Sequence, residues 1–179
     1  SREEGNEQIM LLQCTSLYPA PVALSNLSAM ATMAQAFDVL TGYSDHTLGD
    51  HIVLAAIARG ATVIEKHYTL DRALPGPDHS FAMEPDELKT MMSRIRDVEA
   101  AFGDGAKAGP RAEEMDMFEK GRRSLHARCD IPSGTVITDD MLVAKRPGLG
   151  LAPAQKAIIV GCIAKVDIPA DQWIDWSMV

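Results

Sequence analysis

Short, mostly apolar runs alternate along this chain with stretches of helical spacing. The runs occupy Ile9–Cys14, Val39–Ser44 and Ala61–His67, each of strand length. Between them, apolar residues recur every three or four positions up to Phe37, and again over residues 52–59. Strands that alternate with helices predict a parallel sheet, and strands this apolar predict helices covering both of its faces.

Capping residues define the expected ends of the helices. Asn26 is expected to cap the first helix, and Gly49 or Asp50 to open the second. Gly60 is suited to a left-handed position just after the second helix. A third helix is predicted over Pro85–Phe102, because Pro at the first turn and acidic residues beside it favour a helix N-terminus.

The composition changes after this third helix. Residues 103–121 combine a Gly/Pro-rich stretch with a charged, briefly helical one, which indicates a linker. We therefore divide the chain into a domain at 1–102, a linker at 103–121 and a second domain at 122–179.

The second domain contains an internal repeat. Asp130-Ile-Pro132 recurs as Asp167-Ile-Pro169, and an Ile and a Met follow each copy at matching distances. Because Asp-Ile-Pro is a common turn opening, chance is one explanation. A small β-rich domain with two similar halves also explains the short apolar runs, and we favour it.

Composition narrows the class of protein. With 17 basic and 25 acidic residues the net charge is −8, and 46% of residues are hydrophobic, which excludes a disordered chain and argues against a nucleic-acid binder. The longest strongly apolar run, Ile52–Ala58, is far shorter than the ~20 residues of a membrane span. The N-terminus, which begins with Ser, is too polar for a signal peptide, and Cys14, Cys129 and Cys162 suggest reduced, buried thiols. We expect a cytoplasmic protein.

Two histidines lie at the ends of predicted strands. His46 follows the second strand and His67 closes the third. Ligands of parallel sheets gather beyond the carboxyl ends of the strands, where Ser44 would share a face with His46, and Glu65 with His67. This set could hold a divalent cation, with water completing the coordination. The alternative is that each histidine only makes a local hydrogen bond. His51 and His126 lack such polar partners, and we expect them to be ordinary surface or packing residues.

Other polar residues are candidates for ligand binding on less specific sequence patterns. The Pro75-Gly-Pro-Asp78-His79 turn could present Asp78 to a polar ligand, or be a plain surface turn. Ser16 and Tyr18 follow the first strand and offer hydroxyls to a sugar or a phosphate. Arg146, in a Gly/Pro-rich loop, could bind an anion or a carbonyl oxygen, or could be solvated surface charge.

Taken together, these motifs resemble the sialic acid synthase family over nearly the whole chain. The stretches that carry the resemblance are Leu11-Leu-Gln-Cys-Thr-Ser-Leu-Tyr-Pro-Ala-Pro21, Gly42-Tyr-Ser-Asp-His-Thr47, Gly60-Ala-Thr-Val-Ile-Glu-Lys-His-Tyr-Thr-Leu-Asp71, Pro75-Gly-Pro-Asp78, Arg122-Arg-Ser-Leu-His-Ala127 and Lys145-Arg-Pro-Gly148. The resemblance implies an α/β fold: the last three βα units of a TIM barrel, followed by a small β-rich antifreeze-like (SAF) domain.

The resemblance also implies a reaction and its site residues. Family members condense phosphoenolpyruvate with N-acetylmannosamine, or a related 2-acetamido sugar, to a nine-carbon 2-keto acid and release phosphate. They use a divalent metal, usually Mn²⁺ (Mg²⁺ is possible), and form a domain-swapped homodimer. Carried over, the metal ligands are His46 and His67, the phosphoenolpyruvate residue is Ser44, and the sugar residues are Ser16 (where some members carry Asn), Tyr18, Glu65, Asp78 and Arg146.

Only three barrel strands precede the linker, whereas a TIM barrel needs eight. The family's lysines for the phosphate and its catalytic glutamate have no counterpart here, so no catalytic residue is assigned in this chain. We expect a C-terminal part of a synthase that is inactive on its own. Two alternatives are a non-catalytic SAF-type sugar-binding or dimerisation module, and a compact metal hydrolase built from His46, His67 and Asp78, which lacks a third histidine at suitable spacing.

Overall fold

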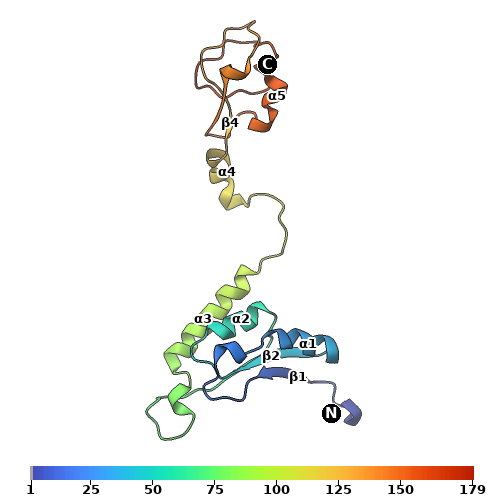
Figure 1. Cartoon of the computed structure of the whole chain (residues 1–179), viewed down its shortest axis with the longest axis vertical. Helices are drawn as coiled ribbons and strands as arrows, with labels where there is room; N and C mark the ends of the chain where they lie inside the picture. The colour runs from blue at the N-terminus through green and yellow to red at the C-terminus, as the bar shows by residue number, and fades with distance from the viewer. Residues whose placement is uncertain (1) are drawn as a thin grey trace. The chain divides into compact units, whose positions relative to one another are not determined.

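A computed structural model describes residues 2–179 of the chain. They form two units, one that ends at Ala106 and one that begins at Lys107, each with its own hydrophobic core. Figure 1 gives the labels of the helices and strands, and each unit is described by itself.

The first unit is a three-stranded parallel sheet with three helices. Strands β1 (Met10–Cys14), β2 (Leu40–Asp45) and β3 (Ile64–Lys66) lie in the order β1-β2-β3, and they alternate with helices α1 (Ser28–Phe37), α2 (His51–Ala58) and α3 (Pro85–Ala101). Every predicted strand and helix of this unit is therefore present. The third strand is shorter than predicted, although Val63 still accepts a hydrogen bond (2.9 Å) from Tyr43 N.

The helices lie on one side of the sheet (Figure 1), and not on both sides as the apolar strands had suggested. The physical reason is the strand order. Successive right-handed crossovers that step in one direction across a sheet place all their helices on the same face. This is the arrangement of a βα barrel, in which the opposite face of the sheet lines the interior.

Three of the four predicted helix signals are confirmed, including Asp50, which directly precedes α2, and one is wrong. Gly60 has a φ of +95° after α2, and the backbone N of Glu84 donates to Glu87 Oε2 (2.9 Å) in a capping box that opens α3. Asn26, however, does not cap α1. Its φ is +44°, in the left-handed region, whereas an N-cap residue needs an extended backbone, and α1 begins at Ser28.

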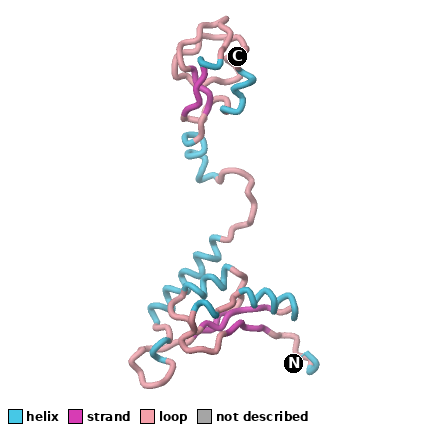
Figure 2. Tube along the Cα trace, in the orientation of Figure 1, coloured by secondary structure: helices cyan, strands magenta, loops and turns pink. Residues whose placement is uncertain are grey.

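The second unit has little regular secondary structure. It consists of helix α4 (Met115–Gly121), an antiparallel pair of strands, β4 (Ser124–Ala127) and β5 (Leu142–Lys145), and the single turn α5 (Lys156–Ile159). The remaining strand-like contacts are isolated bridges, so loops dominate the unit in Figure 2. Its core is aliphatic and includes Leu125, Ile131, Ile137, Leu142, Ile159, Ile168 and Ile174.

The predicted internal repeat is confirmed. Asp130 Oδ1 accepts a hydrogen bond from Ala170 N (2.8 Å), and Asp167 Oδ1 accepts one from Ser133 N (2.7 Å). The two acceptors, at 130 and 167, are 37 positions apart, and so are the two donors, at 133 and 170, so each half makes the same contact with the other. The two halves therefore stabilise one another across a local two-fold relationship.

Two further expectations can be compared with the structure. Cys14, Cys129 and Cys162 are free thiols, but Cys14 and Cys129 are exposed rather than buried. Among the described residues, no helix combines the length and the apolar character needed to cross a membrane.

Candidate functional site

The candidate site lies at the carboxyl ends of the three parallel strands. Ser44 on β2 and Glu65 on β3 are opposite one another in the strand register, and Ser44 Oγ donates to Glu65 Oε1 at 2.7 Å. Ser44 is buried and Glu65 is exposed. The two polar side chains that were predicted to lie beside the histidines are thus joined by a direct hydrogen bond.

The two histidines follow immediately on the same strands. The rings of His46 and His67 are 5.1 Å apart between centroids. His46 Nδ1 lies 2.7 Å from the carbonyl oxygen of Thr15, which can only accept, so this nitrogen carries the proton. In the neutral imidazole this tautomer leaves the lone pair on Nε2, the nitrogen through which such a ring can bind a metal ion.

Two aromatic rings pack against the histidines. Tyr18 lies 4.2 Å from His46 and 5.5 Å from His67 between ring centroids, and Phe81 lies 5.1 Å from His67. Sequence reasoning missed Phe81. It sits in the loop between β3 and α3, and its one signal was an aromatic residue just after the Pro75–His79 turn.

Asp78 is close to this cluster. Its Oδ2 atom lies 3.6 Å from His67 Nδ1, which is too long for a hydrogen bond, and its side chain is 57% exposed. A cavity of about 270 Å³ is lined by His67, Asp78 and their loop neighbours. The predicted turn therefore places Asp78 beside His67.

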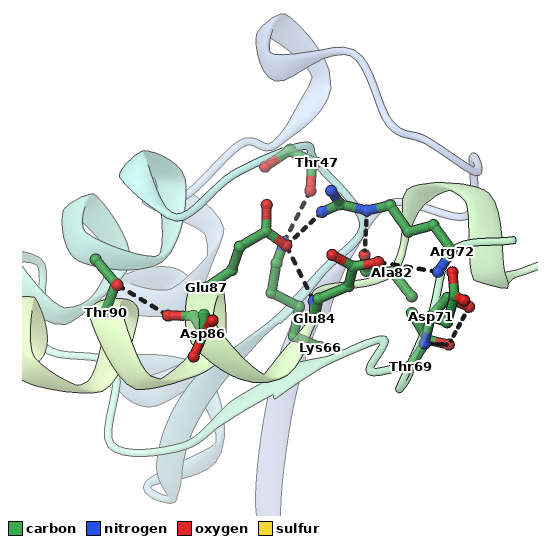
Figure 3. A network of polar contacts seen from close by, with 10 residues as sticks. All are labelled: Thr47, Lys66, Thr69, Asp71, Arg72, Ala82, Glu84, Asp86, Glu87 and Thr90. Atoms are coloured by element: carbon green, nitrogen blue, oxygen red, sulfur yellow. Dashed lines mark hydrogen bonds and ion pairs between the residues drawn. The ribbon is translucent and has the colours of Figure 1, made fainter.

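The loop that carries Asp78 is fastened to the start of α3 (Figure 3). Arg72 Nε donates to the carbonyl oxygen of Ala82 (3.0 Å), Arg72 N donates to Glu84 Oε1 (3.0 Å), and the Arg72 guanidinium forms an ion pair with Glu87. The hydrogen bond from Arg72 lowers the pKa of Glu87 below its usual value. These contacts hold both ends of the loop in place.

A second cavity, of about 320 Å³, lies beside this network. Its lining includes Lys66, Arg72, Phe81, Glu87 and Arg94. The cations there are already matched by carboxylates, because Lys66 pairs with Asp45, Arg72 with Glu87 and Arg94 with Asp50. None of the site residues predicted from the sequence lines this cavity.

The remaining predicted residues are less closely joined to the cluster. Ser16 is an exposed neighbour of Thr15. Arg146 belongs to the second unit, where its Nε donates to the carbonyl oxygen of Gly121 (2.7 Å). His126 is a buried packing residue, as expected, with Nδ1 donating to the carbonyl oxygen of Asp171 (2.8 Å). His51 is exposed.

The donor set suits a metal ion that shares its coordination with other molecules. Within residues 2–179, no cluster of three or more His, Cys, Asp or Glu side chains is arranged to hold a metal ion. The alternative of a compact metal hydrolase needs three protein ligands, and the described residues contain no such group. Imidazole donors such as those of His46 and His67 suit an ion such as Mn²⁺, with water or substrate oxygens at its remaining positions.

Comparison with protein families gives two matches. Residues 1–107 match the model of the NeuB family, and residues 122–179 match the model of the SAF domain.

Curated relatives carry synthase names. The N,N'-diacetyllegionaminic acid synthase of Legionella pneumophila is 41% identical over 174 residues, which are 97% of this chain and 49% of that protein. The N-acetylneuraminate-9-phosphate synthase of Mus musculus is 41% identical over 141 residues, 78% of this chain and 39% of that protein. The chain thus spans about half the length, or less, of these relatives.

Two solved structures are similar to this chain in both fold and sequence. The spore coat polysaccharide biosynthesis protein SpsE of Bacillus subtilis superimposes with a TM-score of 0.56 at 37% identity, covering 99% of this chain and 55% of that one. The N-acetylneuraminic acid synthetase of Leptospira borgpetersenii gives a TM-score of 0.53 at 41% identity, covering 62% of this chain and 38% of that one.

Proposed function

The chain belongs to the NeuB family and carries a SAF domain, and on that premise we propose that it forms part of a sialic-acid-type synthase. The reaction joins phosphoenolpyruvate to the aldehyde of an open-chain 2-acetamido sugar, consumes one water and releases phosphate, giving a nine-carbon 2-keto acid. The observation that carries the proposal is the meeting of Ser44, Glu65, His46 and His67 at the carboxyl ends of adjacent strands.

Each side chain of the cluster has a role in this proposal. His46, through Nε2, and His67 hold a divalent cation, for which we propose Mn²⁺. When bound, such an ion supplies Lewis-acid polarisation of the sugar aldehyde. The hydrogen bond from His46 Nδ1 to Thr15 O (2.7 Å) keeps the His46 ring in the tautomer that this role requires.

Ser44 and Glu65 are proposed to separate when substrates bind. The Ser44 hydroxyl, which donates to Glu65 in the structure, would donate to a phosphate oxygen of phosphoenolpyruvate. Glu65 would then be free to accept a hydrogen bond from a sugar hydroxyl, together with Ser16, Tyr18 and Asp78. This exchange of partners would couple the binding of the two substrates.

Arg146 completes the proposed sugar site. Its planar guanidinium presents several donors in a fixed geometry, which suits the carbonyl oxygen of an acetamido group. We propose that the second unit delivers Arg146 to the site of a partner subunit in a domain-swapped homodimer.

A chimera tests this function directly. The N-terminal half of the Legionella pneumophila synthase would be joined to residues 9–179 of this chain, and phosphate release from phosphoenolpyruvate would be measured with Mn²⁺ and either a 2,4-diacetamido sugar or N-acetylmannosamine. We expect sugar-dependent phosphate release by the chimera and none by the 179-residue chain alone.

Two chimeric variants serve as controls. His67→Ala should abolish phosphate release, whereas His51→Ala, a change at an exposed histidine outside the cluster, should leave it intact. A chimera that folds and dimerises like the parent synthase but turns over neither sugar would contradict the proposed function.

A further inference from the structure

His46 and His67 lie just beyond the region where the backbone pairs β2 with β3. The register of these two strands ends at Asp45 opposite Lys66, one residue before each histidine. His46 is tied to the β1 side through Thr15 O, and the His67 carbonyl oxygen accepts from Met83 N (2.9 Å) in the following loop. Each histidine is thus held by a different neighbour, and the distance between the two needs a separate restraint.

A buried ion pair on the opposite face of the sheet joins the two strand ends at this level. Lys66 Nζ lies 2.6 Å from Asp45 Oδ2, and the two side chains are 7% and 0% exposed. Lys66 Nζ also donates to the carbonyl oxygen of Thr47 at 2.8 Å (Figure 3), and Asp45 Oδ1 accepts from Thr47 N at 2.9 Å. These contacts therefore fix the backbone on both sides of His46, at Asp45 and at Thr47.

Stability alone does not account for these charges. Withdrawing two ions from water costs roughly as much as their attraction returns, and well-packed apolar side chains of similar volume often serve as well or better. Contacts between apolar side chains do not fix a direction. The ammonium of Lys66, in contrast, donates to two acceptors at fixed positions.

We propose that the Asp45–Lys66 ion pair is a positioning pair that sets the separation of His46 and His67 and so allows both to bind one divalent cation. The inference rests on the metal role assigned under the proposed function. Neither Asp45 nor Lys66 would touch the ion, because both side chains point away from the histidines by strand alternation.

The separation matters because metal coordination tolerates little error. A ring nitrogen binds a divalent ion at about 2.1 Å, and a site works only when its ligands stay within about 0.5 Å of the productive geometry. Changes in residues that orient metal ligands commonly weaken affinity by about 10- to 100-fold.

Two double variants of the full chain separate positioning from stability. D45L/K66M replaces the pair with apolar side chains, and D45N/K66Q keeps hydrogen-bonding groups without the charges. Three quantities are measured: the thermal midpoint, the nuclear Overhauser effect between the His46 and His67 ring protons without metal, and Mn²⁺ affinity by electron paramagnetic resonance.

We expect D45L/K66M to melt no lower than the unmodified chain, to lose the contact between the histidine rings and to bind Mn²⁺ at least about 10-fold more weakly. D45N/K66Q should retain both the ring contact and most of the affinity. Arg94→Met, which removes the partly exposed ion pair with Asp50, is the matched control and should change neither.

Every other result counts against the proposal. A folded D45L/K66M with an unchanged ring contact and unchanged Mn²⁺ affinity overturns it, and so does a D45L/K66M that fails to fold, because the pair would then be holding the fold. If the unmodified chain binds no Mn²⁺, the metal role in the proposed function fails, while the ring contact still decides whether the pair positions the histidines.

Discussion

Ile131 and Ile168 exchange both of their backbone hydrogen bonds, each 2.9 Å long, at the centre of the second unit. They occupy the same place in the two copies of Asp-Ile-Pro, and both side chains are 1% exposed. These two hydrogen bonds between equivalent residues add to the contacts of Asp130 and Asp167 that join the two halves of the SAF domain.

The first prediction follows from this contact. Ile131→Ala and Ile168→Ala should each lower the free energy of unfolding of the second unit, by about 2–5 kcal/mol, because each leaves a cavity in the core. Urea unfolding followed by tryptophan fluorescence measures this, since both tryptophans, Trp173 and Trp176, belong to the second unit. The exposed Val136→Ala should change it by less than about 0.5 kcal/mol. Unequal effects of the two isoleucine variants would argue against equivalent halves.

A second prediction concerns Gly42 on β2. A Cβ atom at this position would lie 2.2 Å from the carbonyl oxygen of Val63 and 2.7 Å from Leu12 Cδ2. Gly42→Ala should therefore separate the strands and cost about 1–3 kcal/mol or more, measured by circular dichroism during thermal unfolding. Gly121→Ala, where a Cβ would meet nothing within 4 Å, should be neutral or slightly stabilising. Equal melting of the two variants would show that the sheet can yield at Gly42.

The ion pair between Arg72 and Glu87 predicts a pH dependence. The pKa of Glu87 is lowered in the folded chain, chiefly by the hydrogen bond from Arg72. Its stabilising contribution is therefore present above the unfolded pKa of about 4.3 and is lost as the pH falls through the lower, folded pKa. Because the Glu87 side chain is 44% exposed, we expect less than about 1 kcal/mol.

Urea midpoints of the unmodified chain and Glu87→Gln test this dependence. The variant should be the less stable of the two at neutral pH, and the difference should vanish at a pH below the folded pKa. A difference that stays constant with pH would mean that packing, and not ionisation, sets the effect.

The metal role predicts equal effects at two histidines. His46→Ala and His67→Ala should each weaken Mn²⁺ binding at least about 10-fold, since two protein ligands leave no substitute for a missing one. His51→Ala, at an exposed site, provides the control. Isothermal titration would contradict the assignment if either variant bound Mn²⁺ as tightly as the unmodified chain.

The second unit should not bind the sugar by itself. Residues 107–179 have their own core and can be studied as a separate unit. We expect no measurable binding of N-acetylmannosamine to this unit in a nuclear magnetic resonance titration, because in our proposal Arg146 supplies only one contact of the site. Saturable shifts around Arg146 would instead favour the non-catalytic sugar-binding module.

Much of the fold and part of the candidate site follow from local patterns in the sequence. Strand and helix positions, the glycine after α2, the Glu84-Pro85 helix start and the Asp-Ile-Pro repeat each depend on residues within a few positions of one another. The shared face of Ser44 and His46, and that of Glu65 and His67, follow from the alternation of side chains along a strand.

Only the tertiary structure decided which segments meet. The register of β2 and β3 places Ser44 against Glu65 and Asp45 against Lys66, and no pattern within either strand specifies that pairing. Folding of the long loop after β3 adds Phe81 to the histidine cluster, and the left-handed backbone of Asn26 shortens α1. Local patterns follow from backbone geometry, which is the same in every protein. Which residues distant in sequence come into contact is decided by the packing of the whole unit.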